Sequence, residues 1–167
     1  FTDVVEVAIG ADLCTIEEAN DFIKEVPEKQ PFMATSCCPA WSVMAKKLFP
    51  EFAPYISMAL TPMVLTGRLI KKKYPDCKVV FVGPCAAKKL EARRKSIRSD
   101  VDFVLTFEEF SAILDAKGID ISKCEDGEPF KEGSGDGNGF AVSGGVAKAV
   151  ENIIKEIDPN REVLTAR

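Results

Sequence analysis

Thr35-Ser36-Cys37-Cys38-Pro39-Ala40-Trp41 places two adjacent cysteines between an apolar run, residues 31–34, and a helical pattern, residues 40–49. Adjacent cysteines do not easily pair with each other, so each thiol is expected to face a different neighbour. A proline at the first helical position costs nothing, because the N–H that it lacks would be unpaired there in any case. We therefore predict both thiols at a helix N-terminus, where the helix dipole favours the thiolate.

The composition indicates a globular domain. The chain has 167 residues, 46% of them hydrophobic, which suffices for one domain or slightly more with a real core. A net charge of −4 argues against a nucleic-acid partner. No apolar run approaches the ~20 residues that span a membrane, and no secretory signal is present. We expect a cytoplasmic protein without a membrane partner. Because the chain opens on Phe1 without a methionine, we expect a piece of a longer protein.

The numbers of cysteine and histidine residues limit the kinds of catalytic or metal site that the chain can form. Without an export signal, an even number of cysteines favours metal or redox use over disulfides. The absence of histidine removes the Cys-His hydrolases and the histidine-containing zinc sites. Three of the cysteines are expected to be structural or incidental: Cys14, Cys77 and Cys124.

The order of elements predicts an α/β fold. Strands and helices alternate, which favours a mostly parallel sheet of about four strands with helices on both faces. Ligands of such sheets bind beyond the carboxyl ends of the strands, and Cys37-Cys38 and Cys85 both follow a predicted strand. We expect these cysteines to meet at one edge. The predicted strands are residues 3–9, 31–35, 78–82 and 101–105, and the predicted helices are residues 15–26, 40–49, 60–74, 88–97, 107–117 and 145–157.

Two capping boxes and one loop complete the prediction. Thr15 with Glu18, and Thr106 with Glu109, have the spacing in which a threonine caps a helix and a glutamate reaches back to it. Residues 125–139 are acidic and rich in glycine, so we expect a mobile loop there.

Two cysteines are candidate metal ligands. Thiolates suit iron–sulfur clusters and zinc, and Cys38 and Cys85 lie outside any CxxC pair, which excludes a zinc ribbon or a ferredoxin motif. In Cys85-Ala86-Ala87-Lys88 the lysine lies one helical turn from the thiol, where it would lower the pKa of the thiol or bind an anionic ligand. Glu91, three residues further on, is placed to hold that lysine.

Two segments of the sequence resemble signatures of the iron-only (FeFe) hydrogenase catalytic domain. The first is residues 35–41, and the second is Gly83-Pro84-Cys85-Ala86-Ala87-Lys88-Lys89-Leu90-Glu91. The similarity continues through residues 101–109 and 140–146, so it covers essentially the whole chain. The resemblance implies one lobe of that domain, in a parent that interconverts protons, electrons and H2.

The resemblance also implies roles for single residues. Cys38 and Cys85 would bind the cubane half of the H-cluster, a 4Fe-4S cluster joined to a diiron centre. Cys37 would pass protons to the distal iron. Lys88 would donate a hydrogen bond to a cyanide ligand and would be steadied by Glu91.

A proton path and a pocket follow from the same resemblance. The path would run through Ser57 and Glu18, with Asp21 where the family has a second glutamate. Three residues would line the cofactor pocket: Gly83, Pro84 and Phe140. A ferredoxin or another electron carrier would be the partner.

The chain departs from the family pattern at two points. Catalytic members usually have a methionine where this chain has Gly83, which removes a soft apolar contact and favours a divergent or sensory branch. The third motif, which brings the other two cluster cysteines, is absent from residues 1–167. The chain alone is therefore expected to hold no cluster, and to expose an apolar face where the C-terminal lobe of the same protein docks, with self-association as a consequence.

Other interpretations remain open at this point. A hydrogen sensor or an iron–sulfur assembly factor would be a non-enzymatic relative, and a thiol-redox module using Cys37 and Cys38 is a weaker alternative. The two thiols would also suit a core as small apolar groups. The capping box alone would explain Glu18, and Ser57 would suit a turn.

Overall fold

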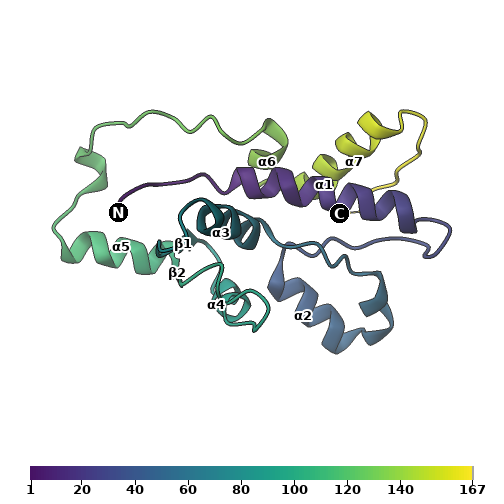
Figure 1. Cartoon of the computed structure of the whole chain (residues 1–167), viewed down its shortest axis with the longest axis horizontal. Coiled ribbons are helices and arrows are strands. Elements are labelled where there is room, and N and C mark those ends of the chain that lie inside the picture. The colour runs from purple at the N-terminus through teal and green to yellow at the C-terminus, as the bar shows by residue number, and fades with distance from the viewer. Residues whose placement is uncertain (167) are drawn as a thin grey trace. The chain divides into compact units, whose positions relative to one another are not determined.

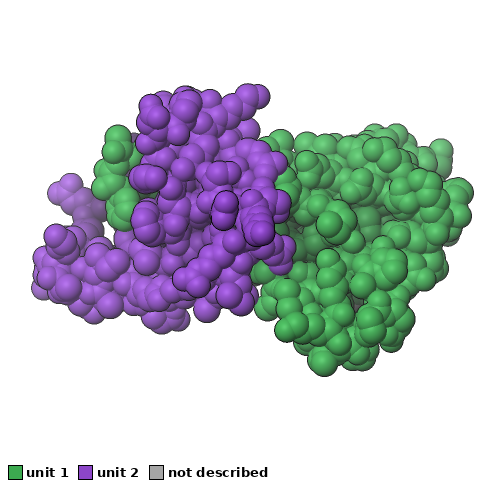
Figure 2. Space-filling model, turned by 60° about the horizontal axis from the view of Figure 1, so that its bottom comes forward, with its two compact units in different colours: residues 1–66, 131–167 green, residues 67–130 purple. Residues whose placement is uncertain are grey.

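The computed structural model describes residues 1–166, which form two compact units. Unit 1 holds residues 1–66 together with the segment from residue 131 onward, and unit 2 holds residues 67–130. Figure 2 colours unit 1 green and unit 2 purple. Each unit is described by itself below.

Helix α1 (Ala8–Glu25) is the central element of unit 1. Its buried side recurs every three or four residues and is made mostly of small side chains, which let neighbouring segments come close to the helix axis. A Cβ at Gly10 would overlap the carbonyl oxygen of Pro62 and the hydroxyl of Thr66. The buried residues of the helix are Ala8, Gly10, Ala11, Cys14, Thr15, Glu18 and Ala19.

Helix α7 (Gly145–Ile157) packs along α1 (Figure 1). The chain enters it through Gly144, whose φ of 76° lies in the left-handed region that favours glycine. Ala19 of α1 and Val150 and Ile154 of α7 form a buried cluster. Partly buried side chains surround it: Phe22, Ile23, Ile153 and Val163.

The short helix α6 (Gly135–Gly139) also packs on α1. A Cβ at Gly137 would lie 2.6 Å from the carbonyl oxygen of Ala8, so only glycine fits there. The backbone N–H of Ser134 donates to Asp12 at 2.9 Å. The prediction of a mobile loop is therefore wrong for residues 133–139, because close glycine contacts and Asp12 hold them against α1.

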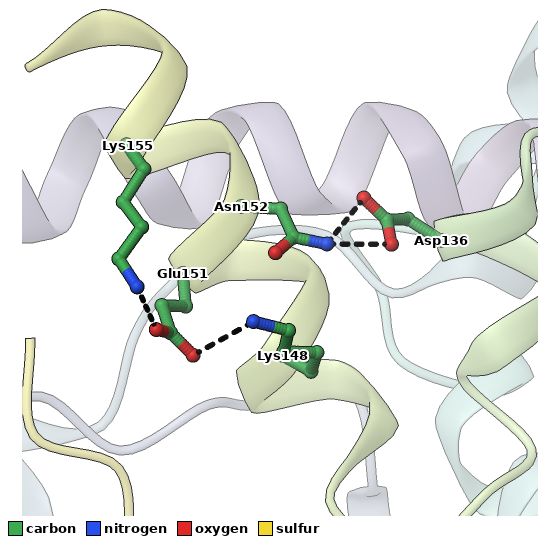
Figure 3. Close-up of polar contacts among 5 residues, drawn as sticks. All are labelled: Asp136, Lys148, Glu151, Asn152 and Lys155. Atoms are coloured by element: carbon green, nitrogen blue, oxygen red, sulfur yellow. Dashed lines mark hydrogen bonds and ion pairs between the residues drawn. The ribbon is translucent and has the colours of Figure 1, made fainter. Parts of the chain in front are cut away.

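Polar side chains join α6 to α7, as Figure 3 shows. The side-chain amide of Asn152 donates to both carboxylate oxygens of Asp136, at 2.9 and 3.1 Å. Glu151 forms ion pairs with Lys148 and Lys155 of the same helix. The contact of Asn152 with Asp136 joins the two helices, whereas the Glu151 pairs lie within α7.

Helix α2 (Pro39–Leu48) and the 3-10 helix η1 (Pro50–Tyr55) follow in unit 1. A parallel bridge between Ala34 and Ile56 places the segment before α2 beside the segment after η1. Several large apolar side chains on these two helices are exposed: Trp41, Val43, Met44, Leu48, Phe49 and Phe52.

Unit 2 is built on two parallel strands, β1 (Val80–Gly83) and β2 (Phe103–Thr106). Val80 pairs with Phe103 and Gly83 pairs with Thr106. Helix α4 (Ala87–Ala92) lies between the strands in sequence, and α5 (Phe107–Ala116) follows β2, as Figure 1 shows. The predicted capping box of Thr106 and Glu109 is confirmed at the start of α5. The 3-10 helix η2 (Ile121–Lys123) ends the unit's regular structure.

Helix α3 (Pro62–Lys73) begins in unit 1, and its second half belongs to unit 2. In unit 2 the guanidinium of Arg68 donates to Asp100 at 2.9 and 3.3 Å. The ammonium of Lys71 pairs with Asp102 at 2.6 Å, and Asp102 also accepts from the backbone N–H of Val79 at 2.9 Å. These contacts tie the helix to the segment that leads into β2.

The expected sheet of about four strands is wrong, because residues 1–166 contain two paired strands and one isolated bridge. The branched residues 3–9 resemble a strand, but the helix begins at Ala8 because its small side chains pack there. Residues 31–35 form only the bridge at Ala34. The coarser prediction, a parallel sheet with helices, is confirmed.

Four predicted helices match α2, α3, α5 and α7, while α4 is shorter than predicted. Within residues 1–166, no helix has both the length and the apolar character that crossing a membrane requires.

We predict that Gly10→Ala destabilises the chain by at least about 2 kcal/mol, because the added methyl group meets the backbone of Pro62 and cannot be accommodated by side-chain rotation. Gly135→Ala is the matched control, since its Cβ would meet nothing within 4 Å and should change stability by less than about 0.5 kcal/mol. Urea unfolding of the three proteins tests this. Equal midpoints for the two variants would refute the close approach at Gly10.

Candidate functional site

The carboxyl of Glu18 is buried inside unit 1. Its Oε1 accepts a hydrogen bond from the backbone N–H of Ser36 at 3.0 Å, and Oε2 has no hydrogen-bond partner among the described residues. The capping role predicted for Glu18 is wrong, because α1 begins at Ala8 and Thr15 lies in the helix interior. There the Thr15 hydroxyl donates to the carbonyl of Ala11 at 2.9 Å.

Burial raises the pKa of the Glu18 carboxyl from 4.5 to about 7. The negative charges of Asp21 and Glu17 act in the same direction. The hydrogen bond from the Ser36 N–H and the nearby Ser57 hydroxyl oppose the shift without cancelling it. A buried carboxyl with a pKa near neutrality can both take up and release a proton under physiological conditions.

The two-cysteine turn lies directly beside this carboxyl in the chain. Ser36, whose N–H contacts Glu18, precedes Cys37, which is half-buried. Cys38 is the N-cap of α2, and its exposed Sγ accepts from the backbone N–H of Trp41 at 3.4 Å. The indole of Trp41 donates to the carbonyl of Thr35 at 3.0 Å and closes the turn. The predicted position at a helix N-terminus is confirmed, and the exposed Cys38 is not a core residue.

The bridge between Ala34 and Ile56 brings Ser57 close to the segment that contains Ser36 and the two cysteines. The N–H of Ser57 donates to the carbonyl of Ala34 at 2.8 Å, and the hydroxyl of Ser57 accepts from the N–H of Ala59 at 3.1 Å. Ser57 is buried. A surface depression nearby, of about 560 Å³, is lined by Glu17, Asn20, Asp21, Lys24, Met58 and Ala59. Unit 1 thus holds the three residues predicted for a proton path, Glu18, Ser57 and Asp21, with Asp21 at the surface.

The second motif forms a turn at the end of β1 in unit 2. Gly83 is the buried last residue of the strand, Pro84 is exposed, and Cys85 is half-buried. A Cβ at Gly83 would lie 2.6 Å from the ring of Phe81, so this ring occupies the space where a larger residue would begin. The carbonyl of Cys85 accepts from the N–H of Lys88 at 3.2 Å.

Lys88 and Glu91 form an ion pair on α4, with their nearest N and O atoms 2.8 Å apart. The side chain of Glu91 is 2% exposed and that of Lys88 is 12% exposed. The contact predicted from their spacing is present. It holds a shielded cation one turn from Cys85.

The remaining predicted residues are placed as follows. Phe140 ends α6 in unit 1 and is half-buried. Cys38 belongs to unit 1 and Cys85 to unit 2. Within residues 1–166, no three cysteine, aspartate or glutamate side chains gather as a metal site would require. The meeting of the two cysteines at one edge therefore stays a prediction, as do the roles of Gly83, Pro84 and Phe140.

A family model described as the iron-only hydrogenase large subunit, C-terminal domain, matches residues 1–165. The chain belongs to this family. The match agrees with the two cysteine motifs and extends through both units.

Curated relatives include enzymes and assembly factors. Iron hydrogenase 1 of Clostridium pasteurianum is 34% identical over 98% of this chain and 31% of its own length. The periplasmic iron hydrogenase large subunit of Nitratidesulfovibrio vulgaris is 33% identical over 89% of this chain and 40% of its own. The cytosolic Fe-S cluster assembly factor NAR1 of Kluyveromyces lactis is 35% identical over 71% of this chain and 25% of its own. The chain thus spans less than half of each relative.

Solved structures of the family have a similar fold. An apo FeFe-hydrogenase from Chlamydomonas reinhardtii aligns with a TM-score of 0.76 at 28% identity, covering 100% of this chain and 48% of that chain. A hydrogenase structure concerned with stepwise H-cluster assembly aligns with a TM-score of 0.74 at 32% identity, covering 93% of this chain and 43% of that chain.

Two contacts of the site are not predicted by the sequence analysis. The N–H of Ser36 holds Glu18, and the indole of Trp41 closes the cysteine turn. Backbone donors have no sequence signature, so the first was not predictable. The position of Trp41 three residues after Cys38 was a usable signal for the second.

We predict that Glu18 makes stability depend on pH. Between about pH 4.5 and 7 the folded chain keeps a proton that the unfolded chain releases, so stability falls as pH rises through this window, by about 3 kcal/mol in total. Glu18→Gln removes the titration and should stabilise the chain by about 2 kcal/mol at pH 8 but hardly at pH 5. Urea unfolding at both pH values measures this, with the exposed Glu28→Gln as control. A Glu18→Gln effect that is equal at both pH values would contradict the raised pKa.

We further predict that Lys88 and Glu91 are coupled. Glu91→Gln leaves the shielded ammonium of Lys88 without its carboxylate and should cost about 3 kcal/mol, whereas the double variant K88M/E91L should recover most of the loss. The exposed pair Lys123–Asp120 is the control, and Asp120→Ala should cost less than about 1 kcal/mol. Denaturant titration of K88M, E91L and the double variant gives the coupling energy. Simple additivity of the Lys88 and Glu91 changes would count against the pair.

Proposed function

We propose that this chain is part of a hydrogenase catalytic domain that interconverts two protons and two electrons with H2. The observation that carries the proposal is the buried Glu18 carboxyl, which has a pKa of about 7 and is hydrogen-bonded to the residue before Cys37. A group of this kind is suited to passing protons to and from a buried centre.

The thiol donors fit the cofactor of the family. Cys38 offers an exposed sulfur at a helix N-terminus, and Cys85 offers one directly after a strand, with the cation of Lys88 one turn away. Thiolates are the ligands of iron–sulfur clusters, and a shielded ammonium suits an anionic ligand of the metal. We propose Cys38 and Cys85 as two ligands of the 4Fe-4S half of an H-cluster. When bound, the cluster would relay electrons and would provide the metal site for the reaction.

The chain's own residues would handle the protons. Asp21 lines the surface depression with Glu17, where the proposed path would meet the solvent, and Glu18 and Ser57 lie inside the unit. Cys37 follows Ser36 and would donate and accept the proton at its Sγ. Lys88, fixed by Glu91, would donate a hydrogen bond to an anionic ligand.

The parent protein has to contribute further parts. Two cysteines supply half of the thiolates of a cubane cluster, so the isolated chain is expected to hold no H-cluster. A C-terminal lobe would bring the remaining ligands and cover the apolar face of α2 and η1, and without that lobe the chain would self-associate. A ferredoxin would deliver electrons. The cytoplasm is the proposed compartment, because the structure leaves Cys38, Cys77, Cys85 and Cys124 as free thiols.

A non-catalytic function is the second candidate. The NAR1 assembly factor has a comparable identity, 35%, although over 71% of this chain rather than 98% as in iron hydrogenase 1. Gly83 also departs from the residue usual in catalytic members. Such a protein would use the same cysteines to hold an iron–sulfur cluster for assembly, or to sense hydrogen, without turnover.

We predict that the full-length parent protein, matured with its cofactor, evolves H2 from reduced methyl viologen, and that Glu18→Gln lowers the rate by about 100-fold because the amide cannot carry a proton. Gas chromatography measures the product. Glu28→Gln, which changes an exposed carboxyl, should leave the rate unchanged.

Two results would overturn these assignments separately. No H2 from a protein whose iron and sulfide content proves a complete cluster would reject the hydrogenase and favour the assembly factor or sensor. Full activity in the Glu18→Gln variant would reject the proton path alone.

A further inference from the structure

A basic loop, defined here as residues 93–98, follows α4 in unit 2. Arg93, Arg94, Lys95 and Arg98 are all exposed, although the chain as a whole carries a net charge of −4. Four cations within six residues repel one another, which costs stability unless anions are nearby. Residues 68–73 have the same number of cations, but there Arg68 pairs with Asp100 and Lys71 pairs with Asp102.

Several other cations of unit 2 have acidic partners. Arg68 pairs with Asp100, Lys89 pairs with Glu109, and Asp102 binds both Lys71 and Lys78. Within residues 1–166, none of the ion pairs of the structure involves a cation of the basic loop. The acids nearest in sequence are already engaged, Glu91 with Lys88 and Asp100 with Arg68. The loop therefore presents charge that the described chain does not neutralise.

The basic loop is held in one conformation by its backbone. The N–H of Arg98 donates to the carbonyl of Arg94 at 2.9 Å, and the N–H of Asp100 donates to that of Ile97 at 2.9 Å. Ile97 is 5% exposed and anchors the loop in the unit. An ordered set of cations binds an anionic surface at a smaller entropic cost than a mobile one.

The loop is also joined closely to the cysteine of the second motif. The N–H of Arg94 donates to the carbonyl of Glu91 at 3.0 Å, and the N–H of Lys88 donates to that of Cys85 at 3.2 Å. Helix α4 between them has six residues, so it is about 9 Å long (Figure 1). A protein bound at the loop would therefore lie near Cys85.

We propose that the basic loop is the docking surface for the acidic face of a protein electron carrier. The proposal rests on the function proposed above, which requires a source of electrons. Covering four cations with an apolar or basic partner would be costly, because buried charge needs a counter-charge, whereas an acidic surface supplies one and speeds the encounter. Nucleic acid fits less well, since the chain is acidic and residues 93–98 contain no aromatic side chain for stacking on bases.

The test uses the full-length parent protein and a small acidic bacterial ferredoxin as the probe. Stopped-flow or surface plasmon resonance gives the association rate constant at low and high salt. The variant R93Q/R94Q/K95Q/R98Q should associate about 10-fold more slowly at 50 mM salt, and the difference should vanish at about 500 mM. The matched control K46Q/K47Q/K72Q/K117Q removes the same charge from other exposed lysines and should change the rate less than about twofold.

Three outcomes would overturn the proposal. The first is equal association of ferredoxin with the loop variant and the control variant. The second is tighter binding of a single-stranded oligonucleotide than of ferredoxin to the same loop. The third is a fall in the melting temperature of the loop variant alone, by more than about 5 °C, which would show that the loop pairs with another part of the parent chain.

Hydrogen evolution from reduced methyl viologen separates this test from that of the proposed function, since viologen needs no docking surface. If the parent protein evolves H2 from viologen and the loop variant binds ferredoxin as fast as the parent does, the docking role of the loop is rejected and the hydrogenase assignment stands. If the matured parent protein evolves no H2 from viologen, the hydrogenase assignment is rejected, and the ferredoxin binding result is unaffected.

Discussion

The close packing of small side chains along α1 is the constraint on which unit 1 depends. Gly10 admits the backbone of Pro62, and Ala8 admits Gly133 and Gly137. These approaches, with the cluster of Ala19, Val150 and Ile154, cover the buried side of the helix. Glu18 lies on that side, and its carboxyl keeps a proton that a solvated carboxyl would lose. The chemistry of the site follows from this packing.

Two carboxyls of this chain show how environment shifts the pKa of an acid in opposite directions. Burial raises the pKa of Glu18 to about 7. For Asp102 burial acts in the same direction, but hydrogen bonds from Lys71, Val79 and Lys78 outweigh it and lower the pKa to about 2. Asp102 thus stays ionised and joins α3 to the segment before β2, while Glu18 is available for proton exchange.

The sequence predicted those features that depend on near neighbours. The helix after Pro39, the capping box at Thr106 and the ion pair of Lys88 with Glu91 all arise within a few residues, and all are present. The start of α1 was missed because branched residues favour a strand locally, whereas packing of Ala8 against distant glycines decides the outcome. The burial of Glu18 was missed for the same reason, since its partner Ser36 is 18 residues away.

The attachment of residues 133–139 to α1 affects the order of events during synthesis. Glu6 and Asp12 bind the backbone of Gly133 and Ser134, which follow more than 120 residues later. At roughly 5–20 residues per second, the ribosome needs on the order of ten seconds to supply that segment. Throughout this interval the side of α1 that residues 133–139 later cover is exposed to chaperones. Any metal delivery that needs a closed interior has to wait for translation to pass residue 139.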